Sequence, residues 1–166
     1  MLYHVDEHVV HPAHGVGRIV GLVTGRFDST DARQYYEIAV ERATVWVPVE
    51  GDPDNALRPL TAKADLPRYR RVLRSSPAEL KSDPRQRRTE LLDRLRGGAF
   101  LDRCEIVRDL TARSWRKALG EGDSSALRKA WEALCQEWAA AEGVPVTEAA
   151  AEITDMLREA QTARQA

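Results

Sequence analysis

Three of the four histidines of this chain, His8, His11 and His14, lie at positions i, i+3 and i+6, directly before a glycine-rich apolar run. Imidazole is the most common metal ligand in proteins, so this spacing raises the question of a metal site. Zinc needs three or four converging ligands, whereas residues three apart in a strand point to opposite faces of the sheet. His11 also precedes a proline, which favours an extended or turn conformation. We therefore expect no metal, and we expect His14 to shape a turn or bond to the backbone.

No other pattern in the chain predicts catalysis or a cofactor. The run GVGRIVG (15–21) lacks the Lys-Ser/Thr ending and the strand-then-helix context of a phosphate-binding loop. The hydrolase signature GxSxG and the metalloprotease signature HExxH are also absent. Cys104 and Cys135 lie far apart in helical apolar patterns, so we expect buried thiols in a reduced cytoplasmic protein. We expect no catalytic residue, no metal, no cofactor and no small-molecule substrate.

The net charge of −1 conceals a strong asymmetry along the chain. Residues 65–118 contain 15 Lys and Arg against 8 Asp and Glu, whereas residues 1–64 contain 6 against 9 and residues 119–166 contain 4 against 9. A basic block between two acidic ones predicts a surface that faces a polyanion such as DNA. The alternative is a set of solvated helix faces.

Arginines recur along the predicted helices of this basic block. Arg85 and Arg88 are three residues apart, so they share a face near a helix N-terminus. The free N–H groups and the dipole of such a terminus favour phosphate, and arginine adds bidentate hydrogen bonds. We expect a subset to contact the DNA backbone independently of base sequence, because the chain has no base-reading motif. Other arginines must instead pair with carboxylates, namely Asp93, Asp102, Glu105 or Asp109.

The first part of the chain has the composition of β-strands. Four segments are rich in β-branched and aromatic residues: EHVVHP (7–12), GVGRIVGLVTGRF (15–27), QYYEIAVE (34–41) and TVWVPVE (44–50). Dense glycines in the second segment predict bulges and curvature. The polar stretches DSTDAR (28–33) and GDPDN (51–55) predict turns. Together these patterns predict a small SH3- or Tudor-like β-barrel over residues 1–62.

From Asp65 onward, apolar residues recur with helical spacing in about five segments. Asp65 and Asp83 are expected N-caps, a Gly-Gly pair at 97–98 ends one helix, and Thr147 is the expected cap of the last helix. Residues 63–166 are therefore predicted to form an all-α domain. The chain as a whole is predicted to be α+β with two domains.

The tryptophans fall into two environments. Trp131 and Trp138 lie on an apolar helical stripe, so we expect them in the core. Trp46 lies between Val45 and Val47 in a predicted strand, and the alternation of the strand directs it outside the barrel. An exposed aromatic residue on an edge strand is a typical protein contact.

Segments along nearly the whole chain resemble one family. HVVHPAHGVGRIVGL (8–22), YYEIAV (35–40), TVWVPVE (44–50) and LRPL (57–60) resemble the N-terminal module of the CarD/CdnL family of bacterial transcription regulators. This module is also similar to the polymerase-interacting domain of transcription-repair coupling factors. LLDRLRGG (91–98), EIVRDLTARS (105–114) and ALGEGDSSALRKAWEALCQEWA (118–139) resemble the helical C-terminal domain of CarD/CdnL, which favours that family.

The resemblance implies two binding surfaces and no catalysis. The Tudor-like domain would bind the RNA polymerase β subunit by adding an exposed strand edge, and the helical domain would contact promoter DNA at the upstream edge of the melted region and stabilise the open complex. The implied surroundings of the polymerase contact are Tyr35, Tyr36, Val45, Trp46 and Val47. The DNA contacts carried over from the family are Arg87, Arg88 and Lys129, and Arg85 is added on its charge and helix position.

Two departures from the family pattern change these expectations. Pro84 stands where the best-known members have a tryptophan that wedges into the minor groove, so we expect phosphate contacts alone. Trp46 stands where a basic residue is common, so we expect a more apolar polymerase contact. Both departures indicate a diverged paralogue.

We therefore expect a bacterial transcription regulator rather than an enzyme, cytoplasmic and associated with the nucleoid through polymerase. The chain shows neither the basic-then-apolar start of a signal peptide nor the run of about 20 apolar residues that a membrane span needs. The alternative is an adaptor whose barrel binds polymerase or another protein while its helical domain does not engage DNA.

Overall fold

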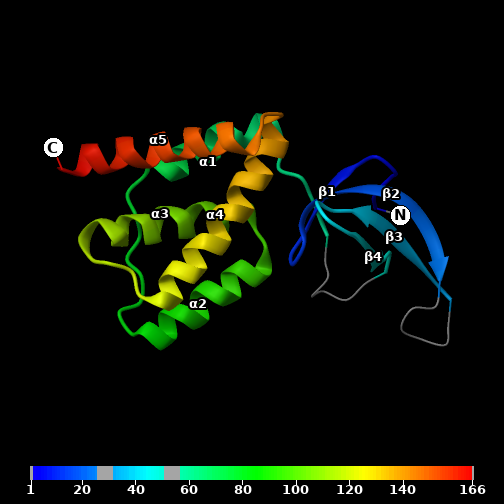
Figure 1. The fold of residues 1–166 in the computed structure, drawn as a ribbon, viewed down its shortest axis with the longest axis horizontal. Coiled ribbons are helices and arrows are strands. Elements are labelled where there is room, and N and C mark those ends of the chain that lie inside the picture. Colours follow the sequence, from blue (N-terminus) through cyan, green and yellow to red (C-terminus); the bar gives the residue numbers. More distant parts are fainter. Residues whose placement is uncertain (1, 26–31, 51–56, 166) are drawn as a thin grey trace. The chain divides into compact units, whose positions relative to one another are not determined.

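The computed structural model describes residues 2–25, 32–50 and 57–165, and the chain divides into two units, Met1–Leu60 and Thr61–Ala166 (Figure 1). The first unit contains a β-sheet and the second consists of helices, which confirms the predicted α+β class. The turns predicted at 28–33 and 51–55 lie largely outside the described residues.

The N-terminal unit is an antiparallel sheet with the strand order β4-β3-β2-β1-β5. Its strands are β1 (His8–His11), β2 (Gly15–Gly25), β3 (Arg33–Ala39), β4 (Thr44–Pro48) and β5 (Arg58–Pro59). Strands β4 and β5 stand at opposite edges and do not pair within the described ranges, so the sheet is open where we expected a closed barrel. A bulge between Ile19 and Gly21 confirms the irregularity predicted for the glycine-dense strand.

One face of the sheet carries a small hydrophobic core. Its buried members are Tyr3, Val9, Ile19, Tyr36, Ile38 and Val47. The Tyr36 hydroxyl accepts a hydrogen bond from the Tyr3 backbone N–H at 3.2 Å, so the segment before β1 is tied to β3. At Gly17 a β-carbon would lie 2.6 Å from Cγ2 of Ile38, so β2 can approach β3 this closely only because the residue is glycine.

The three histidines of the N-terminal segment lie at the turn between the first two strands. His11 Nδ1 accepts hydrogen bonds from the backbone N–H groups of Ala13 (3.0 Å) and His14 (3.2 Å), which shapes the turn from β1 to β2. The turn predicted at His14 is therefore present, and the side chain that organises it is the buried His11. Gly15 completes the turn with a φ of 77°. Across the part of the chain that the structure describes, no three His, Cys, Asp or Glu side chains group as metal ligands would.

The C-terminal unit contains five α-helices, preceded by a 3-10 turn, η2 (Lys63–Asp65). The helices are α1 (Leu66–Arg74), α2 (Pro84–Gly97), α3 (Phe100–Arg116), α4 (Glu121–Glu142) and α5 (Val146–Gln165). Among the described helices, none combines the length and the apolar character required to cross a membrane.

Local signals explain where these helices begin and end. The Asp83 side chain accepts a hydrogen bond from the Arg85 backbone N–H, Pro84 takes the first position of α2, and Gly98 ends the helix with a φ of 75°. The last helix begins before the predicted cap Thr147. It starts at Val146, and the carbonyl of Pro145 accepts hydrogen bonds from the backbone N–H groups of Glu148 (3.0 Å) and Ala149 (3.1 Å).

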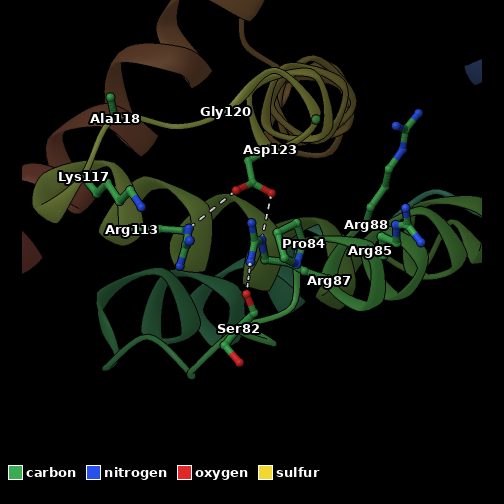
Figure 2. A pocket seen from close by; sticks show the side chains of 11 residues that line it. Ser82, Pro84, Arg85, Arg87, Arg88, Arg113, Lys117, Ala118, Gly120 and Asp123 are labelled. Atoms are coloured by element: carbon green, nitrogen blue, oxygen red, sulfur yellow. Dashed lines mark hydrogen bonds and ion pairs between the residues drawn. The ribbon is translucent and has the colours of Figure 1, made fainter.

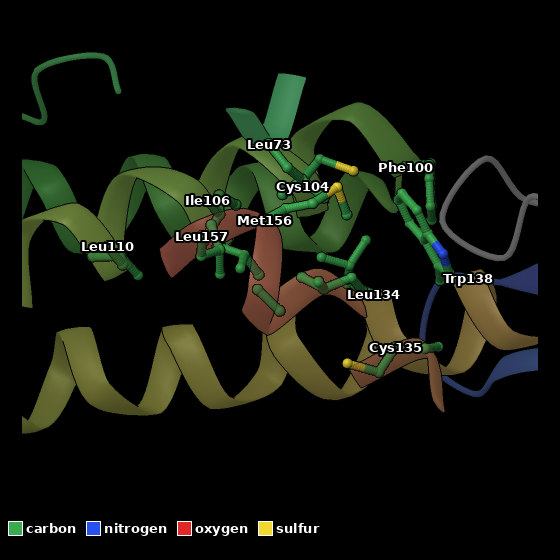
Figure 3. Packing of buried hydrophobic residues seen from close by; sticks show 14 of the residues in the cluster. Leu73, Phe100, Cys104, Ile106, Leu110, Leu134, Cys135, Trp138, Met156 and Leu157 are labelled. Atoms are coloured by element: carbon green, nitrogen blue, oxygen red, sulfur yellow. The ribbon is translucent and has the colours of Figure 1, made fainter. Parts of the chain in front are cut away.

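The core of the helical unit lies mainly between α3, α4 and α5, and α1 adds Leu66 and Leu73 to it (Figure 3). Trp138 and Leu134 of α4 are fully buried and pack with residues of α3 and α5. Cys104 and Cys135 are buried free thiols, as predicted, and burial raises the pKa of both, that of Cys135 to about 11. Both thiols are therefore protonated and unreactive at neutral pH.

One buried carboxylate joins the start of the helical unit to its centre. Glu137, in the C-terminal third of α4, has no exposed surface. Its Oε2 accepts from the backbone N–H (3.2 Å) and from Oγ1 (2.6 Å) of Thr61, and its Oε1 pairs with the Arg103 guanidinium at 3.1 Å. The first residue of the unit is thus held against the C-terminal part of its longest helix.

The His11 turn predicts a pH dependence of the N-terminal unit. Burial, followed by the nearby His14, lowers the pKa of His11 below its ordinary value, so the native state binds fewer protons than the unfolded chain. The contribution of His11 to the stability of the N-terminal unit should be fully present above the unfolded pKa of about 6.5. It should be lost as the pH falls towards the lower pKa of the native state. We expect amide exchange at Ala13 and His14 to accelerate relative to the intrinsic rate between pH 7 and pH 5.

His11→Asn is the matched variant, because its side-chain oxygen can accept the same bonds and does not titrate. In the His11→Asn protein, the protection factors of the Ala13 and His14 amides should not change between pH 7 and pH 5. An equal loss of protection in both proteins would refute the role given to His11.

Candidate functional site

The N-terminal end of α2 presents two exposed arginines on one face. Asp83 and Pro84 start the helix, and Arg85 and Arg88 follow at a spacing of three residues. Figure 2 shows both side chains projecting from the same side of α2. The predicted shared face is therefore present, and it lies at the positive end of the helix dipole.

These arginines line an open groove of about 560 Å³. The opposite wall comes from the end of α3 and from the turn that leads into α4. At Gly120 and Gly122 an added β-carbon would meet nothing within 4 Å, so the backbone of this wall is openly accessible. The lining residues are Ser82, Pro84, Arg85, Arg87, Arg88, Arg113, Lys117, Ala118, Gly120, Gly122 and Asp123. We call this the α2 groove.

Arg87 does not share the exposure of its neighbours. Its Nε lies 3.0 Å from Oδ1 of Asp123, and the side chains of this pair are only 8% and 9% exposed. Its NH1 donates to the backbone carbonyl of Ser82 (3.2 Å, Figure 2) and to that of Lys81 (2.9 Å). The guanidinium that the sequence assigned to DNA is thus bonded inside the protein, where it anchors the segment before α2 to the start of α4.

The α2 groove carries more positive than negative charge. Arg113 Nε lies 3.5 Å from Oδ2 of Asp123, so this one carboxylate compensates two guanidinium groups. Arg85, Arg88 and Lys117 are exposed, and within residues 57–165 none of them forms an ion pair at 4 Å or less. The remaining positive charge is available to an anion outside the protein.

Other arginines of the basic block are paired as predicted. Arg94 bonds to Asp102 (2.8 Å) and Glu105 (3.3 Å), and further pairs join Arg96 to Asp93 and Arg108 to Asp109. Asp123 was not among the predicted partners. It lies 36 residues from Arg87 in sequence, and no local spacing relates the two.

Lys129 is an exposed residue of α4. It follows Gly122, a lining residue of the α2 groove, by seven residues, so both lie on the same side of the helix. At 1.5 Å per residue, Lys129 is about 10 Å further along the axis. It can therefore extend a track of positive charge from the groove along α4.

In the N-terminal unit, the five residues expected near the polymerase contact have unequal exposure. Tyr35, Tyr36 and Val47 are at most 5% exposed, and Val45 is half-buried. Trp46 is 46% exposed. Of the five, only Trp46 offers a large surface to a partner.

The pairing of β4 with β3 determines which groups point outward. The Val49 N–H donates to the carbonyl of Gln34, and the Val40 N–H donates to the carbonyl of Ala43. Along β3 and β4, residue pairs that are hydrogen-bonded to each other therefore alternate with pairs that are not. The intervening pair, Glu37 with Trp46, directs its backbone groups away from the other strand. The backbone of Trp46 thus faces the outer edge of the sheet, and its side chain lies on the face opposite the core residue Val47.

Comparisons with known proteins match both units. A family model described as CarD, C-terminal domain, matches residues 69–154, which are 86 of the 166 residues, and a model described as CarD-like/TRCF RID domain matches residues 3–60. Among curated proteins, the chain is similar to "Putative transcription factor YdeB" of Bacillus subtilis (strain 168). The two are 25% identical over 145 residues, which cover 86% of this chain and 94% of the relative.

The internal position of Arg87 predicts a structural cost on its removal. Arg87→Met leaves Asp123 buried with Arg113 alone, at 3.5 Å, and should lower the free energy of unfolding of the helical unit by about 2–4 kcal/mol in urea titrations followed by circular dichroism. Arg96→Met, on the same helix, removes a pair whose side chains are 74% and 62% exposed and should cost less than about 1 kcal/mol. Equal effects of the two substitutions would contradict the buried role.

Proposed function

Since this chain belongs to the CarD family, regulators of transcription that interact with RNA polymerase, we propose that it acts on the promoter complex through two surfaces. The edge of the sheet at β4 binds the β subunit of polymerase. The α2 groove and Lys129 contact the phosphates of promoter DNA at the upstream edge of the melted region. Through these two contacts the protein would be located in the cytoplasm and associated with the nucleoid.

The DNA contact is proposed because some arginines of the helical unit are paired inside the protein, whereas others are exposed at the α2 groove. Eight of the sixteen arginines of the helical unit are bonded to carboxylates within residues 57–165, whereas Arg85, Arg88 and Lys117 surround an accessible groove at a helix N-terminus. Phosphate binding at such a terminus combines the helix dipole with the charge of the arginine side chains. Arg87 positions this surface and does not touch the DNA. Contacts of this kind are independent of base sequence and sensitive to salt.

The polymerase contact acts through an edge strand. A strand at the edge of a sheet can pair with a strand of another protein, and an exposed aromatic side chain beside it supplies much of the binding energy. Trp46 meets both conditions. Tyr36 of β3 and Val47 of β4 lie in the core beneath this edge. Val45 lies on the same face of β4 as Val47, and Tyr35 of β3 lies on the opposite face of the sheet.

The two contacts together modulate the lifetime of the open complex. Attachment to polymerase raises the effective concentration of the α2 groove near the DNA, so individually weak phosphate contacts become occupied. The regulator shifts the equilibrium between closed and open promoter only by its differential affinity for the two states. A difference of about 1 kcal/mol changes the open-complex lifetime about fivefold.

Charge reversal in the α2 groove tests the DNA contact. Arg85→Glu/Arg88→Glu should weaken binding to a promoter fragment about 10- to 100-fold near 50 mM salt and should reduce the slope of log K against log salt by about 2. Fluorescence anisotropy over a salt series measures both quantities. The double variant should also shorten the half-life of open complexes formed by purified polymerase.

Arg71→Glu/Arg164→Glu is the control, because it makes the same charge change at exposed positions of α1 and α5 outside the groove. Its DNA affinity should fall less than about threefold. If wild-type protein binds polymerase but does not bind the promoter fragment even at about 50 mM salt, the chain is an adaptor without a DNA contact. If it binds the fragment and Arg85→Glu/Arg88→Glu leaves the affinity unchanged, the α2 groove is excluded as the contact.

Truncation of Trp46 tests the polymerase contact. Trp46→Ala should weaken capture of the isolated β-subunit lobe about 10- to 30-fold, as expected for an aromatic hot spot, and Trp46→Phe should retain most of the affinity. Val146→Ala, which removes exposed apolar surface from the helical unit, should have no effect. A Trp46→Ala protein that is folded and binds the lobe normally would exclude this edge as the contact.

A further inference from the structure

A second groove, lined by different residues, opens on the helical unit between α3, α4 and α5. Its volume is about 550 Å³. The lining residues are Thr111 and Trp115 of α3; Ser124, Leu127, Arg128 and Trp131 of α4; and Thr154, Leu157, Arg158 and Gln161 of α5. We call this the tryptophan groove, and it shares no lining residue with the α2 groove.

The spacing of the lining residues gives the tryptophan groove a definite length. Positions i, i+3, i+4 and i+7 line it on α4, beginning at Ser124, and the same spacing recurs on α5, beginning at Thr154. Each wall is therefore a stripe two helical turns long, about 10 Å. A concave surface with helical walls of this length fits the side of one further helix.

The floor of the tryptophan groove is an open edge of the hydrophobic core. Leu127 and Trp131 pack against the core and remain partly exposed, so the expectation that Trp131 is a core residue holds for only part of its side chain. Trp115 is also half-buried. Large aromatic and aliphatic side chains held by the core on one side are typical anchors of a protein interface.

Two cations lie at the tryptophan groove. Arg128 and Arg158 occupy the i+4 position of their stripes, and within the described parts of the helical unit neither forms an ion pair. Eight of the other fourteen arginines of the unit do form such pairs: Arg70, Arg74, Arg87, Arg94, Arg96, Arg103, Arg108 and Arg113. Carboxylates of an occupant can pair with Arg128 and Arg158 in the same way.

We propose that the tryptophan groove binds an amphipathic helix of a protein partner, with large apolar side chains at i, i+3, i+4 and i+7 and acidic residues beside them. The lining is mainly apolar and hydroxyl-bearing with two cations, whereas surfaces that follow a nucleic acid backbone are densely cationic. This inference goes beyond the proposed function, because it needs neither the α2 groove nor β4. It gives the protein a third contact, through which an acidic partner can be recruited.

A pair of synthetic helical peptides tests the proposal on the full chain. One carries leucines at i, i+3, i+4 and i+7 with glutamates on the flanks, and the other has lysines in place of the glutamates. We expect the acidic peptide to bind and to shift the indole N–H resonances of Trp115 and Trp131. Arg128→Glu/Arg158→Glu should weaken this binding at least tenfold and should make the lysine peptide the preferred ligand.

Arg85→Glu/Arg88→Glu provides the matched control, since it makes an equal charge change in the α2 groove and should leave peptide binding within twofold of wild type. The proposal is overturned if the acidic peptide fails to bind at 1 mM, or if charge reversal at 128 and 158 leaves its affinity unchanged. It is also overturned if an oligo-dT strand binds these residues in place of the peptide. Self-association that disappears in the 128/158 variant would assign the groove to a second copy of the chain.

Discussion

Buried carboxylates decide which arginines of the helical unit can act on its surface. Glu137, Asp109 and Asp123 are each less than 10% exposed, and each holds a guanidinium group within the fold. A buried charge must be paired, so these pairs form wherever the helices bring them together, and the cations left over define the exterior. The α2 groove is positive because Asp123 is shared between Arg87 and Arg113 and leaves Arg85 and Arg88 outside.

Periodicity and local signals were sufficient to predict the elements of this fold. The cap at Asp83, the stop at 97–98 and the turn after β1 depend on a few neighbouring residues, and each is found where it was expected. The open sheet was not predictable in this way, because closure depends on whether β4 and β5 meet, and they are distant in sequence. The start of the last helix was misplaced because its first hydrogen bonds go to the carbonyl of Pro145, so the helix begins at Val146 and the hydroxyl of Thr147 is not needed as a cap.

The site was predicted less well than the fold, for a physical reason. Arg87 and Arg88 are adjacent and chemically identical, yet only one faces solvent. A signal was present: Arg87 precedes the buried Leu91 by four residues, so helical geometry places it on the core side. Its partner Asp123 could not be inferred, since their contact exists only after α2 packs against α4. Tyr35 and Tyr36 show the same limit, because both faces of β3 are covered.

The tether between Thr61 and Glu137 has a mechanical consequence. Tension that arrives along the backbone from residue 60 reaches Thr61, which two hydrogen bonds hold to a buried carboxylate of α4 that Arg103 of α3 also holds. Such a load therefore enters the helical unit through two packed helices together, rather than through the start of α1 alone, where a helix end would fray.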